Sequence, residues 1–140
     1  MKKRYTILII SIILFSVALA FPAVYTQNSE MYGLACFMLG WADLTGDGTA
    51  WLANPLFFIA GFFLLIKQVK ISIVFSFFAI CMSLYYLSAE TITVNEAGTK
   101  SPIVSYGPGY YLWITSFLSL LIGSVIILRS SQKAPAERIS

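Results

Sequence analysis

Apolar residues in this chain gather in four long runs instead of alternating with polar ones. The runs cover residues 5–24, about 51–67, 71–89 and 110–128, and charge appears only at the end of the second, at Lys67. A helix needs roughly 20 apolar residues to cross the core of a bilayer, whereas membrane β-strands alternate polar and apolar residues. The pattern therefore predicts an all-α membrane protein, a single integral domain built as an antiparallel four-helix transmembrane bundle.

The first run has a second interpretation, as a secretory signal. Residues 1–4 are a basic start, residues 7–17 an apolar middle, and Ala18-Leu19-Ala20 is a small-residue cleavage pattern. However, the run stays apolar through Val24, which makes it long enough to span. We therefore favour an uncleaved first helix.

The second run is the shortest and contains Asn54-Pro55 near its start. Proline is tolerated in a first helical turn, where its missing N–H would have had no partner. Either Asn54 caps a helix that begins at Pro55, or the helix begins at Trp51 and bends. We favour the bend, because the Lys67 amine at the far end can reach the interface.

The cationic residues lie almost entirely on one side of the four runs. Lys100 is the exception among the nine lysines and arginines, and the other eight flank the opposite ends: Lys2, Lys3, Arg4, Lys67, Lys70, Arg129, Lys133 and Arg138. Because cytoplasmic loops are enriched in lysine and arginine, both termini are expected in the cytoplasm, with the chain integral to a bacterial-type cytoplasmic (inner) membrane. The loops at 25–50 and 90–109 then face outward.

Two features of the chain predict how the helices pack. Small residues recur every three or four positions in the third and fourth runs, as expected where helices approach closely in lipid. These are Ser72, Ser76, Ala79 and Ser83, followed by Ser116, Ser119 and Gly123. In addition, the first outer loop contains a twelve-residue apolar segment, 31–42, which is too short to cross. We expect it to form a short helix on, or dipping into, the outer mouth of the bundle.

Aromatic and acidic residues are concentrated on the outer side. Tyrosine and tryptophan belong to both membrane interfaces, but they also dominate binding hot spots. The excess on one side indicates either a thick aromatic belt or a recognition surface. The candidate recognition residues are Trp41, Trp51, Tyr85, Tyr86, Glu90, Tyr106, Tyr110, Tyr111 and Trp113.

The segment around Asp43, Thr45 and Asp47 resembles the start of an EF-hand calcium loop, with oxygen ligands at positions 1, 3 and 5 and Gly48 at position 6. The resemblance covers about eight residues and lacks the bidentate glutamate at position 12, which is Asn54 here. This makes it a weak calcium candidate beside an ordinary glycine-rich turn.

Composition narrows the function classes further. The 140 residues are 59% apolar and 11% charged with a net charge of +3, which excludes an ordinary soluble domain and argues against a nucleic-acid partner. The chain has no histidine, the commonest general base and metal ligand, so we expect neither an enzyme nor a cofactor. Its two cysteines, Cys36 and Cys81, leave a disulfide open.

The expected function is therefore recognition. Besides the lipid bilayer, the expected partner is another membrane or envelope protein, met by the aromatic, mildly acidic outer face in the manner of an accessory subunit or immunity protein. The alternative is an oligomeric channel or a transporter that binds a small solute or lipid, and homo-oligomerisation is left open.

Overall fold

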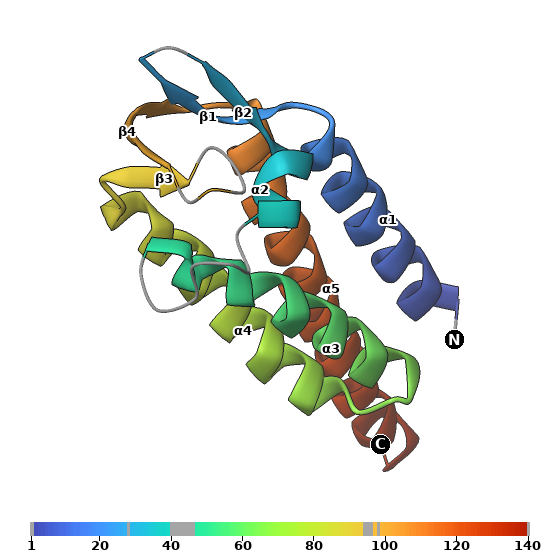
Figure 1. Cartoon of the computed structure of the whole chain (residues 1–140). Helices are drawn as coiled ribbons and strands as arrows, with labels where there is room; N and C mark the ends of the chain where they lie inside the picture. The colour runs from blue at the N-terminus through green and yellow to red at the C-terminus, as the bar shows by residue number, and fades with distance from the viewer. Residues whose placement is uncertain (1, 28, 40–46, 94–96, 98, 140) are drawn as a thin grey trace.

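A computed structural model describes residues 2–27, 29–39, 47–93, 97 and 99–139. These residues form helices at one end of the molecule and a sheet at the other (Figure 1). In chain order the elements are α1 (Lys2–Leu19), β1 (Pro22–Thr26), β2 (Glu30–Tyr32), α2 (Gly33–Leu39), η2 (Asp47–Leu52), α3 (Ala53–Leu65), α4 (Val69–Tyr85), η3 (Tyr86–Ser88), β3 (Thr91–Thr93), β4 (Lys100–Tyr106) and α5 (Pro108–Ile139).

The prediction of an all-α, four-helix transmembrane bundle is wrong. Among the described residues, two helical stretches are long and apolar enough to cross a membrane, namely Val69–Ser88 and Pro108–Lys133. The first predicted span, 5–24, breaks after Leu19, and Pro22 opens a strand. The second predicted span shrinks to the 13 residues of α3, which reach only about 20 Å at about 1.5 Å per residue.

The sheet is the element that the hydrophobic pattern did not reveal. It is antiparallel with the strand order β2-β1-β4-β3, so it joins the first and second outer loops. Val24 in β1 pairs with Tyr106 in β4, and Ile92 in β3 pairs with Ser101 in β4. Figure 1 shows this sheet at the end of the helices that lies away from both chain ends and from the α3–α4 turn.

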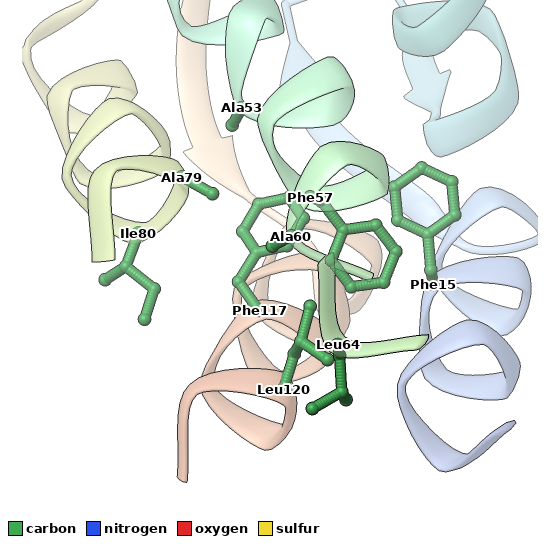
Figure 2. Packing of buried hydrophobic residues seen from close by; sticks show 9 residues of the cluster. All are labelled: Phe15, Ala53, Phe57, Ala60, Leu64, Ala79, Ile80, Phe117 and Leu120. Atoms are coloured by element: carbon green, nitrogen blue, oxygen red, sulfur yellow. The ribbon is translucent and has the colours of Figure 1, made fainter. Parts of the chain in front are cut away.

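The helical half is held together by an aromatic and aliphatic core. Phe57 of α3 lies between Phe15 of α1 and Phe117 of α5 (Figure 2), with ring centroids 5.2 Å from each. Ala53 and Ala60 are fully buried one turn away on either side, and their small side chains let the neighbouring helices approach α3. Stacked and tilted ring pairs of this kind add to the free energy gained by burying their area.

Serine hydroxyls also join neighbouring helices. Ser11 Oγ of α1 lies 2.8 Å from Ser119 Oγ of α5, and Ser72 Oγ of α4 lies 3.3 Å from Ser124 Oγ of α5. The outward faces of α1, α3, α4 and α5 are apolar: Ile9, Ile13, Phe62, Phe77, Phe78, Ile122 and Ile126 are all exposed. Serine contacts between helices together with exposed apolar side chains are typical of helices that associate in lipid.

A buried arginine ties the start of the chain to the α3–α4 turn. The Arg4 guanidinium donates from Nη1 to the Leu65 carbonyl oxygen at 3.2 Å. That carbonyl is among the last four of α3, which have no partner within the helix and carry its negative dipole end. The arginine therefore stabilises α3 at the point where the chain reverses direction.

Two helical glycines with different neighbours test this packing. In Gly33→Ala, the added Cβ would fall on the backbone of Ala18 and Leu19 at the end of α1, which cannot move aside. We expect the free energy of unfolding to fall by about 1–3 kcal/mol although alanine is the better helix former. Chemical denaturation in detergent measures this change.

Gly61→Ala is the matched control. There the added Cβ would meet the Cδ1 of Leu8 at 2.9 Å, which is the movable end of a side chain. Its free energy of unfolding should change by less than about 1 kcal/mol, because the gain in helix propensity offsets the contact. Equal losses in both variants would contradict the close approach of α2 to α1.

Candidate ligand-binding cavity

A cavity of about 100 Å³ lies between the sheet and the helices. It is found where the helical core meets a second apolar cluster of Ala23, Val24, Met31, Ile92 and Tyr110. The lining residues are Ala18, Leu19, Ala23, Val24, Gly33, Cys36, Phe37, Leu39, Ala50, Trp51, Asn54, Tyr86, Thr91, Ile92, Gly109, Tyr110 and Trp113. None of these described lining residues is an aspartate, glutamate, lysine or arginine, so the wall is largely apolar and uncharged.

Two tyrosine hydroxyls attach the sheet end of the molecule to the end of α4. The Tyr110 hydroxyl donates to the Ser83 carbonyl oxygen at 2.7 Å, and the Tyr106 hydroxyl donates to the Tyr86 carbonyl oxygen at 2.6 Å. The Ser83 carbonyl also accepts from the backbone N–H of Tyr86, and the Tyr86 carbonyl from that of Ala89, so each tyrosine hydroxyl adds a second hydrogen bond. The two rings are also close, with centroids 4.7 Å apart. This fixes one wall of the cavity.

Trp113 of α5 and Asn54 of α3 form the polar part of the wall. The Trp113 indole Nε1–H donates to Asn54 Oδ1 at 2.7 Å. Asn54 is the second residue of α3 and no side chain caps that helix, so the interpretation of Asn54 as an N-cap is wrong. Its side chain instead crosses to the neighbouring helix. Trp113 packs against both apolar clusters and thereby joins them.

The rest of the Asn54 side chain is available to the cavity. Asn54 lines the cavity and is only 4% exposed. Its Nδ2 amide donates to no acceptor among the described residues. Ser76 Oγ, and not Asn54 Nδ2, is the wholly buried side-chain atom without a partner in the described part of the chain, so the amide nitrogen is open to the cavity. The cavity therefore holds a polar group with unused hydrogen-bonding capacity.

Helix α2 and η2 make the opposite wall. The Trp51 indole N–H donates to the Phe37 carbonyl oxygen at 2.8 Å, and the two rings are 6.2 Å apart. Burial raises the pKa of the Cys36 thiol to about 12, so it remains an uncharged, weakly nucleophilic thiol at neutral pH. Cys36 and Cys81 are both free, so the disulfide left open by the sequence is not formed.

The residues predicted to form a recognition surface are divided between interior and exterior. Trp51, Tyr86, Tyr110 and Trp113 line the cavity, and Tyr106 packs against Tyr110 beside it. Tyr85 and Tyr111 are 56% and 57% exposed, and Glu90 is also exposed; none of these three lines the cavity. Trp41 lies outside the described residues. The sequence did not show which of these rings face inward.

The calcium candidate lies largely outside the described residues. This is the case for Asp43 and Thr45, whereas Asp47 begins η2. Among the described residues, no three cysteines, aspartates or glutamates gather in a way that could hold a metal ion. Calcium binding at this loop remains a prediction.

Sequence reasoning missed the most informative lining residue, Asn54, and the aliphatic contributions of Val24 and Ile92. Asn54 gave one signal: it is a polar residue that interrupts the apolar stretch from Trp51 to Phe58. Its partner Trp113 lies 59 residues further along the chain, which no local pattern can indicate.

Comparison with known proteins gives no relative on which to base a function. No protein-family model matches the chain, and neither the curated proteins nor the solved structures include a significant match. The functional argument therefore depends on the geometry of the cavity.

A pair of adjacent tyrosines tests the attachment of α5 to α4. Tyr110→Phe removes the hydroxyl that donates to the Ser83 carbonyl oxygen from a fully buried ring. We expect it to lower the free energy of unfolding by about 0.5–2 kcal/mol, since one buried hydrogen bond is lost. Thermal or denaturant unfolding in detergent measures the difference.

Tyr111→Phe deletes the same atom from the exposed neighbouring ring and should leave the free energy of unfolding unchanged within about 0.5 kcal/mol. If the two variants unfold alike, the Tyr110 hydroxyl does not hold the two helices together.

Proposed function

We propose that this protein is a binding protein of the cytoplasmic membrane that holds a small, uncharged, apolar molecule in the cavity between its sheet and its helices. The observation that supports this most directly is the cavity itself, about 100 Å³ in volume and walled by aromatic and aliphatic side chains. Ligand sites are typically concave and mainly apolar, with a few placed polar groups. This is the small-ligand alternative raised by the sequence.

The size of the cavity supports the same function. Packing in protein interiors leaves few voids larger than a water molecule, whereas this cavity has a volume of about 100 Å³. An engineered cavity of about 150 Å³ with an apolar lining binds benzene. The volume here is suited to a ring, or to one end of a longer molecule.

The helical half of the molecule supports a location in the membrane. Two helices are long and apolar enough to cross, and the exposed side chains of α4 and α5 include Phe77, Phe78, Ile122 and Ile126. We propose that α4 and α5 cross the cytoplasmic membrane with Lys70, Arg129 and Lys133 on the cytoplasmic side, together with both termini. The sheet and its cavity then lie at the outer surface.

Recognition of a membrane or envelope protein is the second candidate function. It is favoured by the exposed rings of Tyr85 and Tyr111 near the sheet end of α4 and α5, because exposed tyrosines are frequent in binding surfaces. It concerns a different surface from the cavity, so the two functions are compatible. Binding is proposed in place of catalysis, because the chain contains no histidine to act as a general base.

Benzene tests whether the cavity accepts an apolar guest. In detergent micelles, titration with benzene should produce saturable shifts of the Val24 and Ile92 methyl resonances in NMR spectra, since both residues line the cavity. The Ile122 methyls, which are exposed on α5, should show only the non-saturating change caused by benzene in the micelle.

Two alanine substitutions serve as a matched pair for this titration. Ala50→Leu adds three carbon atoms at a buried lining position and should abolish the saturable shifts. Ala97→Leu makes the same change at an exposed position away from the lining and should leave them intact. Absence of saturable shifts in the unsubstituted protein, or their persistence in Ala50→Leu, would overturn the proposed function.

Labelling in intact cells tests the proposed orientation. In a Cys81→Ser background, Val104→Cys introduces a thiol at an exposed position of the sheet, and Lys133→Cys introduces one near the end of α5. A membrane-impermeant maleimide should label Val104→Cys in whole cells, and Lys133→Cys only after the cells are permeabilised. The opposite pattern would place the sheet in the cytoplasm.

A further inference from the structure

We propose that the ligand of this cavity is an uncharged molecule whose carbonyl oxygen accepts a hydrogen bond from the side-chain amide of Asn54. This inference rests on the proposed function and specifies the chemical class of the ligand. Three observations support it. The Asn54 amide is oriented by Trp113, the neighbouring donors of Trp51 and Tyr110 already have acceptors in the protein, and the described wall carries no charge.

The orientation of the Asn54 amide is determined by its partner. An indole N–H can only donate, so the Asn54 atom 2.7 Å from Trp113 Nε1 must be the carbonyl oxygen, Oδ1. The assignment of oxygen and nitrogen in an asparagine normally has to be inferred from such partners, and here it is unambiguous. Trp113 therefore turns the amide nitrogen of Asn54 away from itself.

The amide nitrogen of Asn54 is a donor without an acceptor among the described residues, at the wall of a partly open cavity. Asn54 is more than nine-tenths buried and lines the cavity, and Nδ2 has no acceptor among the described residues. Buried polar groups in folded proteins are almost always hydrogen-bonded. An acceptor supplied by a molecule in the cavity satisfies this one.

Other polar groups of the wall are already engaged. The Trp51 indole N–H donates to the Phe37 carbonyl oxygen, and the Tyr110 hydroxyl donates to the Ser83 carbonyl oxygen. Both point their hydrogen atoms at the protein itself. The Asn54 amide is thus the donor that remains for a ligand among these three residues.

The lack of charged residues in the described wall excludes anionic acceptors. A carboxylate or phosphate also accepts hydrogen bonds, but transfer of an anion into an apolar site is very unfavourable without a cation beside it. The described lining contains no lysine and no arginine. The acceptor is therefore neutral, as are the carbonyl oxygens of ketones, esters and amides.

The volume sets how much of the ligand enters. About 100 Å³ is less than the 150 Å³ of an apolar cavity that binds benzene, so the cavity takes up the carbonyl and the carbon atoms next to it, and the rest of a ring or chain extends through its opening. The ester linkage of a lipid acyl chain and a free small ketone share this chemistry. Both present a neutral carbonyl next to apolar carbon.

Two probes of the same size test the requirement for a carbonyl. Cyclohexanone and methylenecyclohexane have equal numbers of non-hydrogen atoms, and differ in that C=O replaces C=CH₂. We expect cyclohexanone to bind about three- to tenfold more tightly, the range that one net hydrogen bond provides. Saturable methyl shifts of Val24 and Ile92 report binding of either probe, and the Asn54 side-chain amide resonance should shift only with cyclohexanone.

Two variants connect the preference to Asn54. Asn54→Leu, made in a Trp113→Phe background so that no indole N–H is freed toward the cavity, has a similar volume and no donor, so it should bind both probes with equal affinity. Trp113→Phe retains Asn54 but removes the indole that orients it, and should reduce the preference for cyclohexanone. The second variant keeps the test decisive if Asn54→Leu does not fold. An unchanged preference in either folded variant would overturn the assignment to Asn54.

The outcomes separate this inference from the proposed function. If neither probe gives saturable shifts, the cavity is not a ligand site and the proposed function fails. If both bind equally to the unsubstituted protein, the proposed function stands and the carbonyl requirement is overturned. A preference that disappears in Asn54→Leu supports both.

The source of the carbonyl is resolved by changing the lipid. In nanodiscs without added probe, the Asn54 side-chain amide resonance should differ between ester-linked and ether-linked phospholipids if a lipid ester occupies the cavity. If the resonance is the same in both and moves only with cyclohexanone, a free carbonyl compound is the ligand. No movement in either experiment would overturn the inference.

Discussion

Close approach between helices through buried serine hydroxyls is the contact on which this architecture depends. Ser11 with Ser119 and Ser72 with Ser124 bring α1 and α4 against α5 from two sides, and the outward faces carry phenylalanine and isoleucine. In helices that associate in lipid, small polar residues at the interface determine which faces pack together, and the serine pairs here are contacts of this kind.

That packing fixes the positions of the helix ends to which the sheet end of the molecule is attached. Tyr106 and Tyr110 donate to carbonyl oxygens at the end of α4, and Trp113 connects α5 to Asn54 of α3. All three come from β4 or from the first turns of α5. The cavity lies where the apolar cluster of the sheet meets that of the helices, and these tethers keep the two at a fixed separation.

The parts of this structure that local patterns can indicate were predicted, and the parts that depend on distant partners were not. Long apolar runs revealed where helices form, and the apolar segment 31–42 does contain the short helix α2. The first helix is shorter than the apolar run that predicted it, because the chain enters β1 at Pro22. The partner of β1 is β4, about 80 residues further along the chain. Strands of three to seven residues joined over such distances leave only weak alternation, as in Thr91-Ile92-Thr93. For the same reason the sequence placed the aromatic residues on the outer side but did not show that Trp51, Tyr86, Tyr110 and Trp113 line a cavity.

Asn54 also explains how so small a site can discriminate between ligands. An apolar cavity alone distinguishes molecules by size, and a single carbon atom changes affinity only modestly. A buried donor adds a penalty for every ligand that leaves it without an acceptor, and this rejects close analogues more strongly than it rewards the correct molecule. Leucine at position 54 would remove this penalty and would also leave the Trp113 N–H without its acceptor. The indole and the amide therefore act as one unit, in which Trp113 orients the donor and Asn54 presents it to the cavity.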